Sequence, residues 1–107
     1  MCIANSTDEI LRCCIQGTIP VNANLQQAIE AHERTALQKG AQQLRWFLLT
    51  AIILAHVRTV EDDRAQLDYL AAVPESEWPP TPAPFTSRRE DTLNMIRRSI
   101  AWREICA

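Results

Sequence analysis

The four cysteines and two histidines are the side chains of this 107-residue chain that most often bind metal or carry catalysis. The cysteines are Cys2, Cys13, Cys14 and Cys106. A zinc site normally uses closely spaced pairs of cysteine or histidine, and these positions form no such pattern. Cys13 and Cys14 are adjacent, and neighbours on a helix point about 100° apart. We therefore expect structural or incidental cysteines, with a redox switch as the alternative, and no metal.

The histidines do not indicate an acid–base pair. His56 lies in an apolar stretch, where a histidine is typically paired with a backbone or acidic group rather than acting as a base. His32 is followed by Glu33, but adjacent helical positions do not face each other. Two isolated glycines cannot form a glycine-rich phosphate loop. The sequence predicts a protein that is not an enzyme and uses no cofactor.

Charge is unevenly distributed along the chain. The whole chain has a net charge of −2, but residues 85–107 contain five arginines and three acids. A weakly negative molecule has no overall field that attracts nucleic acid. The arginines are scattered around the expected last helix, and a proline-rich stretch precludes a helix-turn-helix there. A nucleic-acid partner is therefore not expected, and a role as a DNA-binding accessory protein ranks below the protein-binding functions described at the end of this section.

Composition favours helices. The chain is 47% hydrophobic, has only two glycines and is rich in alanine, leucine and glutamine, which lose little freedom in a helix. Its length suits a single domain. The predicted fold is all-α: a small helical bundle of four to five helices around a long central helix, with a Pro-rich strap before the last helix.

Capping signals set the expected boundaries. Ser6 with Glu9, and Ser87 with Glu90, have capping-box spacing, and Pro74 ends the helix before the strap. Four closely spaced prolines favour an extended path in the strap. The expected elements of the single domain 1–107 are a short helix at about 7–16, a long helix at about 23–57, a helix at about 60–73, the strap at 74–86 and a helix at about 88–105.

The long helix at 23–57 contains Gly40, and two interpretations remain open there. We favour one continuous or gently kinked helix, and a helical hairpin at Lys39–Gly40 is the alternative. A continuous helix would be about 50 Å long, which exceeds the width of so small a domain. Its apolar half would need a second copy or a partner as cover, so we expect a homodimer. The run from Trp46 to Val57 is shorter than the roughly 17–25 residues of a membrane span.

Protein binding is the function that fits these features best. The last helix has a main apolar stripe with Leu93 and Ile96, and Met95 and Trp102 form a second one. Tryptophan, methionine and arginine are common in binding hot spots. The candidate interface residues for a partner or a dimer are Trp46, Phe47, Leu48, Ile52, Met95, Arg97, Arg98 and Trp102.

We expect a cytoplasmic, non-enzymatic regulator that inhibits or sequesters a larger protein by covering its surface. The location follows from an N-terminus without the basic and apolar regions of a secretion signal. One form of this function is an anti-activator of a transcription regulator. Alternatives are a phage-type inhibitor of a host enzyme or motor, and a structural subunit of a helical assembly.

Overall fold

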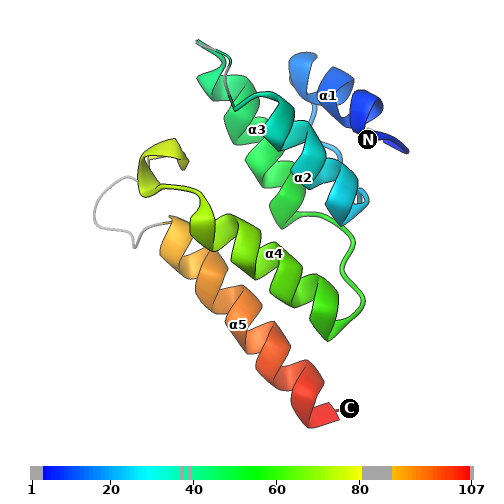
Figure 1. Ribbon diagram of the computed structural model, residues 1–107, viewed down its shortest axis with the longest axis vertical. Coiled ribbons are helices and arrows are strands. Elements are labelled where there is room, and N and C mark those ends of the chain that lie inside the picture. The colour runs from blue at the N-terminus through cyan, green and yellow to red at the C-terminus, as the bar shows by residue number, and fades with distance from the viewer. Residues whose placement is uncertain (1–3, 37, 39, 81–87, 107) are drawn as a thin grey trace. The chain divides into compact units, whose positions relative to one another are not determined.

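The computed structural model describes residues 4–36, 38, 40–80 and 88–106. Within these ranges the chain forms five α-helices, one short 3-10 helix and no strand (Figure 1). The all-α fold predicted from composition is therefore confirmed. Internal packing divides the chain into two compact units, residues 1–57 and 58–107. None of the described helices is long and apolar enough to cross a membrane.

The first unit begins with α1, Thr7–Ile15, close to the predicted boundaries. The Ser6 side chain accepts a hydrogen bond from the Glu9 backbone N–H at 3.2 Å. The Glu9 carboxylate in turn accepts a hydrogen bond from the backbone N–H of Asn5 at 3.0 Å. In a standard capping box it would accept from the N–H of the N-cap residue, Ser6, so the partner lies one residue earlier. Gly17, with φ of 83°, ends the helix in a left-handed conformation.

The long helix at 23–57 is wrong. The structure has two helices there, α2 at Leu25–Arg34 and α3 at Gln42–Ile53. Gly40 has φ of 74°, a conformation outside any α-helix, and the Thr35 hydroxyl donates to the His32 carbonyl at the end of α2. The hairpin alternative is the observed one. Ala41, the N-cap residue of α3, makes no side-chain capping hydrogen bond, so the start of this helix has no sequence signal.

The core of the first unit lies where its three helices meet. Contacts join α1 with α2, α2 with α3 and α1 with α3 (Figure 1). The largest fully buried side chains there include Ile10, Leu48 and Ile52. A backbone hydrogen bond from the His56 N–H to the Ala23 carbonyl, at 2.9 Å, holds the segment after α3 beside the segment before α2. α1, α2 and α3 thus form a three-helix unit.

The second unit is a helical hairpin of α4, Val60–Ala72, and α5, Arg88–Cys106 (Figure 1). The Thr59 side chain caps α4 by accepting from the Asp62 N–H at 3.1 Å, as its sequence predicts. Three acids, Glu61, Asp62 and Asp63, occupy the first turn, where their negative charges interact favourably with the positive end of the helix dipole. The two helices lie side by side, and their mutual contact forms the packed interior of this unit.

The predicted strap at 74–86 is described only in its first part. Glu75–Glu77 form a single 3-10 turn, η1, which the proline count did not predict. Trp78 follows in an extended conformation and is buried, so it anchors the start of the strap in the core. Phe85 and the capping residue Ser87 lie outside the described residues.

Candidate functional site

The inner face of α5 packs on α4. Thr92, Leu93 and Ile96 are buried on this face. The Arg89 guanidinium donates to the Ala71 carbonyl at 3.0 Å, at the C-terminal end of α4. This satisfies a carbonyl that the end of a helix leaves without an intrahelical donor. One full side of α5 is therefore committed to the hairpin.

A buried carboxylate joins the other end of the hairpin. Asp63 is 3% exposed, and its Oδ2 lies 2.7 Å from Arg103 Nε and accepts a hydrogen bond from Ser99 Oγ at 3.1 Å. Arg103 also donates through Nη1 to the Arg58 carbonyl at 2.6 Å. Arg64 and Glu104 form a further ion pair between the helices. These polar contacts fix which side of α5 faces outward.

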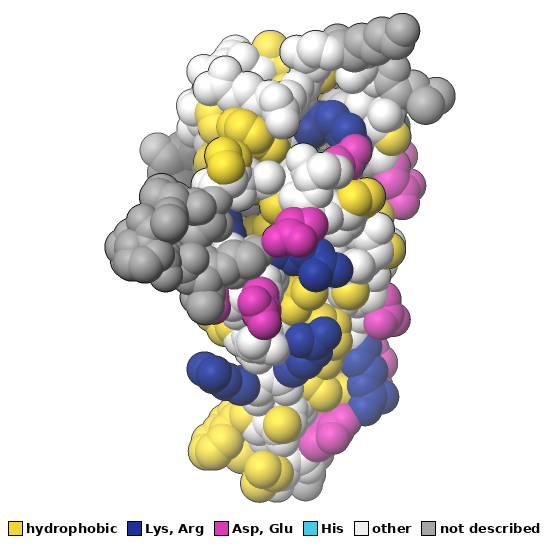
Figure 2. All heavy atoms as spheres, turned by 90° about the vertical axis from the view of Figure 1, so that its left-hand side faces the viewer, with side chains coloured by type: hydrophobic (Ala, Val, Ile, Leu, Met, Phe, Trp, Pro, Cys, Tyr) yellow, Lys and Arg dark blue, Asp and Glu magenta, His cyan; other side chains and the backbone are white. Residues whose placement is uncertain are grey.

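The outward side of α5 carries large apolar side chains in water. Met95 is 57% exposed, Trp102 68% and Ile105 77%. At 100° per residue, Met95 and Trp102 lie about 20° apart around the helix and Ile105 about 60° further. Arg98 falls between them. We call Met95, Arg98, Trp102 and Ile105 the α5 outer face; hydrophobic side chains gather at the C-terminal end of α5, beside basic ones (Figure 2).

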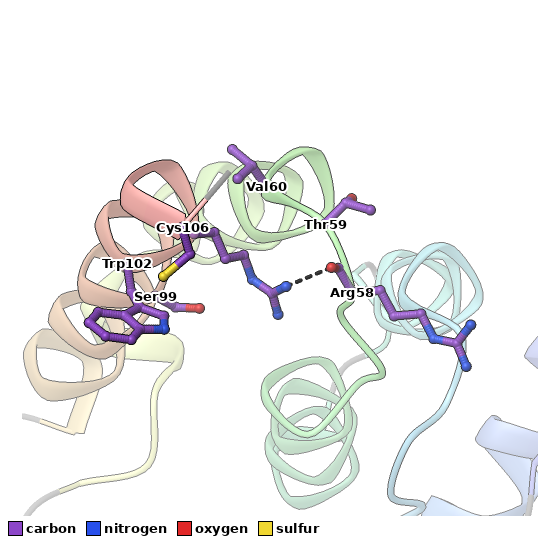
Figure 3. A pocket seen from close by; sticks show the side chains of 7 residues that line it. Arg58, Thr59, Val60, Ser99, Trp102 and Cys106 are labelled. Carbon is purple, nitrogen blue, oxygen red and sulfur yellow. Dashed lines mark hydrogen bonds between the residues drawn. The ribbon is translucent and has the colours of Figure 1, made fainter.

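A groove adjoins this face at the open end of the hairpin. Its cavity is about 560 Å³, and its lining residues are Arg58, Thr59, Val60, Ser99, Trp102, Arg103 and Cys106. Figure 3 shows Ser99, Trp102 and Cys106 projecting from α5, whereas the Arg58 guanidinium points away. The polar groups of Ser99 and Arg103 are already engaged with Asp63 and the backbone. The groove therefore offers packing surface rather than an acid–base pair.

The structure separates the two predicted arginines of α5. Arg98 lies on the α5 outer face with Met95 and Trp102. Arg97 lies about 160° around the helix from Met95 and donates to Asn94 Oδ1 at 3.0 Å. Sequence reasoning also missed Ile105, although its spacing of three residues from Trp102 was a usable signal.

The predicted residues of α3 lie mostly in the core. Leu48 and Ile52 are fully buried, and α1 and α2 pack against their helix. Neither side chain therefore offers exposed surface to a partner or a second copy in this structure. Trp46 and Phe47 are half-buried, and Leu54, just after the helix, is exposed. Because α3 has only 12 residues, the length argument for a dimer through a central helix no longer applies.

A second groove lies in the first unit. Its cavity is about 360 Å³, and its lining residues are Cys14, Ile15, Gln16, Gly17, Gln43, Leu44 and Phe47. Ile15, which is 69% exposed, is the large apolar side chain at the α1 end of this groove. This groove joins Phe47 to the end of α1 and has no charged lining residue.

The cysteines differ in environment. Burial raises the pKa of the Cys14 thiol to about 11, so it is a protonated core residue near neutrality. Cys106 is a free, exposed thiol. Cys13 is disulfide-bonded, and Cys2 lies outside the described residues. Among the described residues, no group of three or more His, Cys, Asp or Glu side chains is arranged to hold a metal ion.

The two histidines differ in burial. His32 is buried within α2, and His56 is exposed after the end of α3.

Comparison with protein families, curated proteins and solved structures finds no match to this chain. Its site is therefore interpreted from geometry alone.

Proposed function

We propose that this protein is a non-enzymatic regulator that binds a larger protein and covers part of its surface, using the α5 outer face and the adjoining groove. The exposure of Met95, Trp102 and Ile105 on one side of a helix supports this most directly. Three large apolar side chains in one stripe are costly to hydrate, at about 25 cal/mol per Å². A partner that covers them gains that energy.

The composition of this surface supports protein as the ligand. Tryptophan, methionine and arginine are enriched at the cores of protein interfaces, and tryptophan and arginine dominate their hot spots. Arg98 and Trp102 meet that description, and the groove beside Trp102 can receive a side chain of the partner. An anti-activator that covers part of a transcription regulator is one form of this function.

Affinity capture with matched variants tests the proposal. The full-length wild-type chain, Trp102→Ala and Arg97→Ala serve as baits in lysate from the source organism, with bound proteins identified by mass spectrometry. We expect a partner that the wild type and Arg97→Ala retain and that Trp102→Ala loses at least tenfold. Arg97 is the control because it is exposed on the same helix but lies away from the α5 outer face.

Two results would count against the proposal. One is a set of captured proteins that does not differ between wild type and Trp102→Ala. The other is capture of nucleic acid with affinity that falls steeply with salt, since that behaviour identifies phosphate contacts.

A further inference from the structure

We infer that, in the absence of a partner, a second copy of this chain covers the α5 outer face, with the two α5 helices antiparallel about a two-fold axis near residue 100. The inference concerns the same surface as the proposed function but does not depend on it. It replaces the dimer through the central helix, whose apolar residues are in the core.

The spacing along the α5 outer face is self-complementary. A two-fold axis between antiparallel helices pairs positions whose numbers have a constant sum, because each surface meets its own copy. Met95 and Ile105 lie five residues on either side of position 100, and Arg98 and Trp102 lie two residues on either side. The axis therefore pairs Met95 with Ile105 of the other copy, and Arg98 with Trp102 of the other copy, each twice.

Both pairs are chemically matched. Methionine is flexible and packs readily against an aliphatic side chain such as Ile105. A guanidinium over the face of an indole gains a cation–π interaction, and tryptophan is the best aromatic partner for it. The pairing thus gives every member of the α5 outer face a suitable neighbour.

Other alignments are poorer. A parallel pair of helices would place Arg98 beside Arg98 of the other copy, which brings like charges together. Moving the antiparallel helices by one heptad in one direction would place Met95 against Arg98, and Trp102 against Asp91. The opposite shift would pair Trp102 with Ile105 but leave Met95 and Arg98 with no opposing residue before position 107. The charge pattern therefore selects the antiparallel arrangement centred near residue 100.

The exposed area sets the expected strength. Covering two tryptophans, two methionines and two isoleucines removes roughly 1,000 Å² of surface from water, at the low end for a specific interface. We expect self-association in the micromolar range, weak enough for a protein partner to displace the second copy. Because the inner face of α5 packs on α4, the hairpin itself stays folded when the copies separate.

Analytical ultracentrifugation of the purified full-length chain tests the association. We expect a monomer–dimer equilibrium between 1 and 100 µM, and a dissociation constant raised at least tenfold by Arg98→Glu. Arg97→Glu is the matched control, with the same charge reversal at the adjacent exposed position, and should change the constant less than twofold. A wild-type chain that is monomeric throughout, or equal effects of the two reversals, would overturn the inference. Circular dichroism confirms that both variants keep their helices.

Disulfide cross-linking tests the alignment. Two chains in a Cys106→Ser background, one with Met95→Cys and one with Ile105→Cys, are mixed and oxidised with diamide, which converts two thiols to a disulfide. We expect a heterodimer linked between positions 95 and 105, and little cross-linking of the Met95→Cys chain with itself. Preferential 95–95 linkage would contradict the antiparallel alignment.

These outcomes separate the two proposals. A dimer without a captured partner leaves the inference standing and contradicts the proposed function. A monomer that captures a partner through Trp102 does the reverse.

Discussion

Arg103 Nε lies 2.7 Å from the buried Asp63 Oδ2, and this ion pair joins the last turns of α5 to the first turn of α4. The N–H is not aligned on that oxygen well enough for a hydrogen bond, so the contact is chiefly one of charge. Arg103 is one-third exposed whereas Asp63 is almost fully buried. The pair therefore depends on the arginine to offset the cost of burying the acid.

Asp63→Asn should destabilise the hairpin. The substitution removes the charge that attracts Arg103 and weakens the acceptor for Ser99. Because Arg103 is partly solvated, we expect a loss of about 2 kcal/mol, below the value for a fully buried pair. Urea denaturation followed by circular dichroism measures it. Asp68→Asn, on the exposed side of the same helix, should change stability by less than about 0.5 kcal/mol; equal losses would show that the pair contributes nothing.

Leu48→Ala should destabilise the first unit by about 2–5 kcal/mol, because it removes a fully buried side chain and leaves a cavity. Leu54→Ala provides the control, since Leu54 is 42% exposed just beyond the same helix. Denaturant titration compares the two. A Leu48 variant that stays as stable as the wild type but sediments as a smaller species would instead indicate that Leu48 lies in an interface between copies.

Gly40→Ala distinguishes the hairpin from a continuous helix by the sign of its effect. At φ of 74°, with open space around the position, an added methyl group strains only the backbone, at a cost of about 1–2 kcal/mol. In a continuous helix the same change would stabilise by about 1 kcal/mol. Thermal unfolding should therefore show a lower Tm for Gly40→Ala. Gly40→Asn should lose less, because asparagine tolerates the left-handed region better.

The Cys14 thiol should make stability depend on pH in the alkaline range. Burial raises its pKa in the folded protein from 9.0 to about 11. Below pH 9 the thiol is neutral in both states, and its contribution to stability is complete. As pH rises from 9 to 11 the unfolded chain loses the proton first, so that contribution is lost. The stability advantage of the wild type over Cys14→Ala should shrink over this range.

Cys106→Ala supplies the control for this measurement. Its thiol is exposed and free, so this variant shows the effect of removing a thiol outside the core. Urea denaturation at several pH values between 8 and 10.5 gives both differences. A difference for Cys14→Ala that stays constant would show that the thiol ionises equally in the folded and unfolded states.

Helix starts with side-chain caps were predictable from sequence. Ser6, Asn24 and Thr59 each accept a hydrogen bond from a backbone N–H three residues on, and the helices begin where these residues stand. The start of α3 was not predictable, because Ala41 provides no capping group. Gly40 alone could not decide between a kink and a turn, since glycine tolerates helical and left-handed backbone alike.

The candidate site was predictable only in part. The spacing of Met95 and Trp102 placed them on one stripe, but composition could not tell which of the two stripes of α5 faces α4. Asp63 and Arg103 decide this through a contact between residues far apart in the sequence. Helix α3 is almost wholly apolar, so its sequence pattern does not show which of its faces is buried in the core. Leu48 and Ile52 were therefore equally compatible with the core and with an interface.

The division at Val57 has a consequence for how the chain acquires its structure. Each compact unit consists of consecutive helices, so its contacts close short stretches of sequence. Such local topology is associated with folding in microseconds to milliseconds. During synthesis the first unit has its whole sequence once residue 57 has left the ribosome, so we expect it to fold before the α4–α5 hairpin has been made. The apolar side chains of α3 are then already enclosed when the exposed stripe of α5 appears.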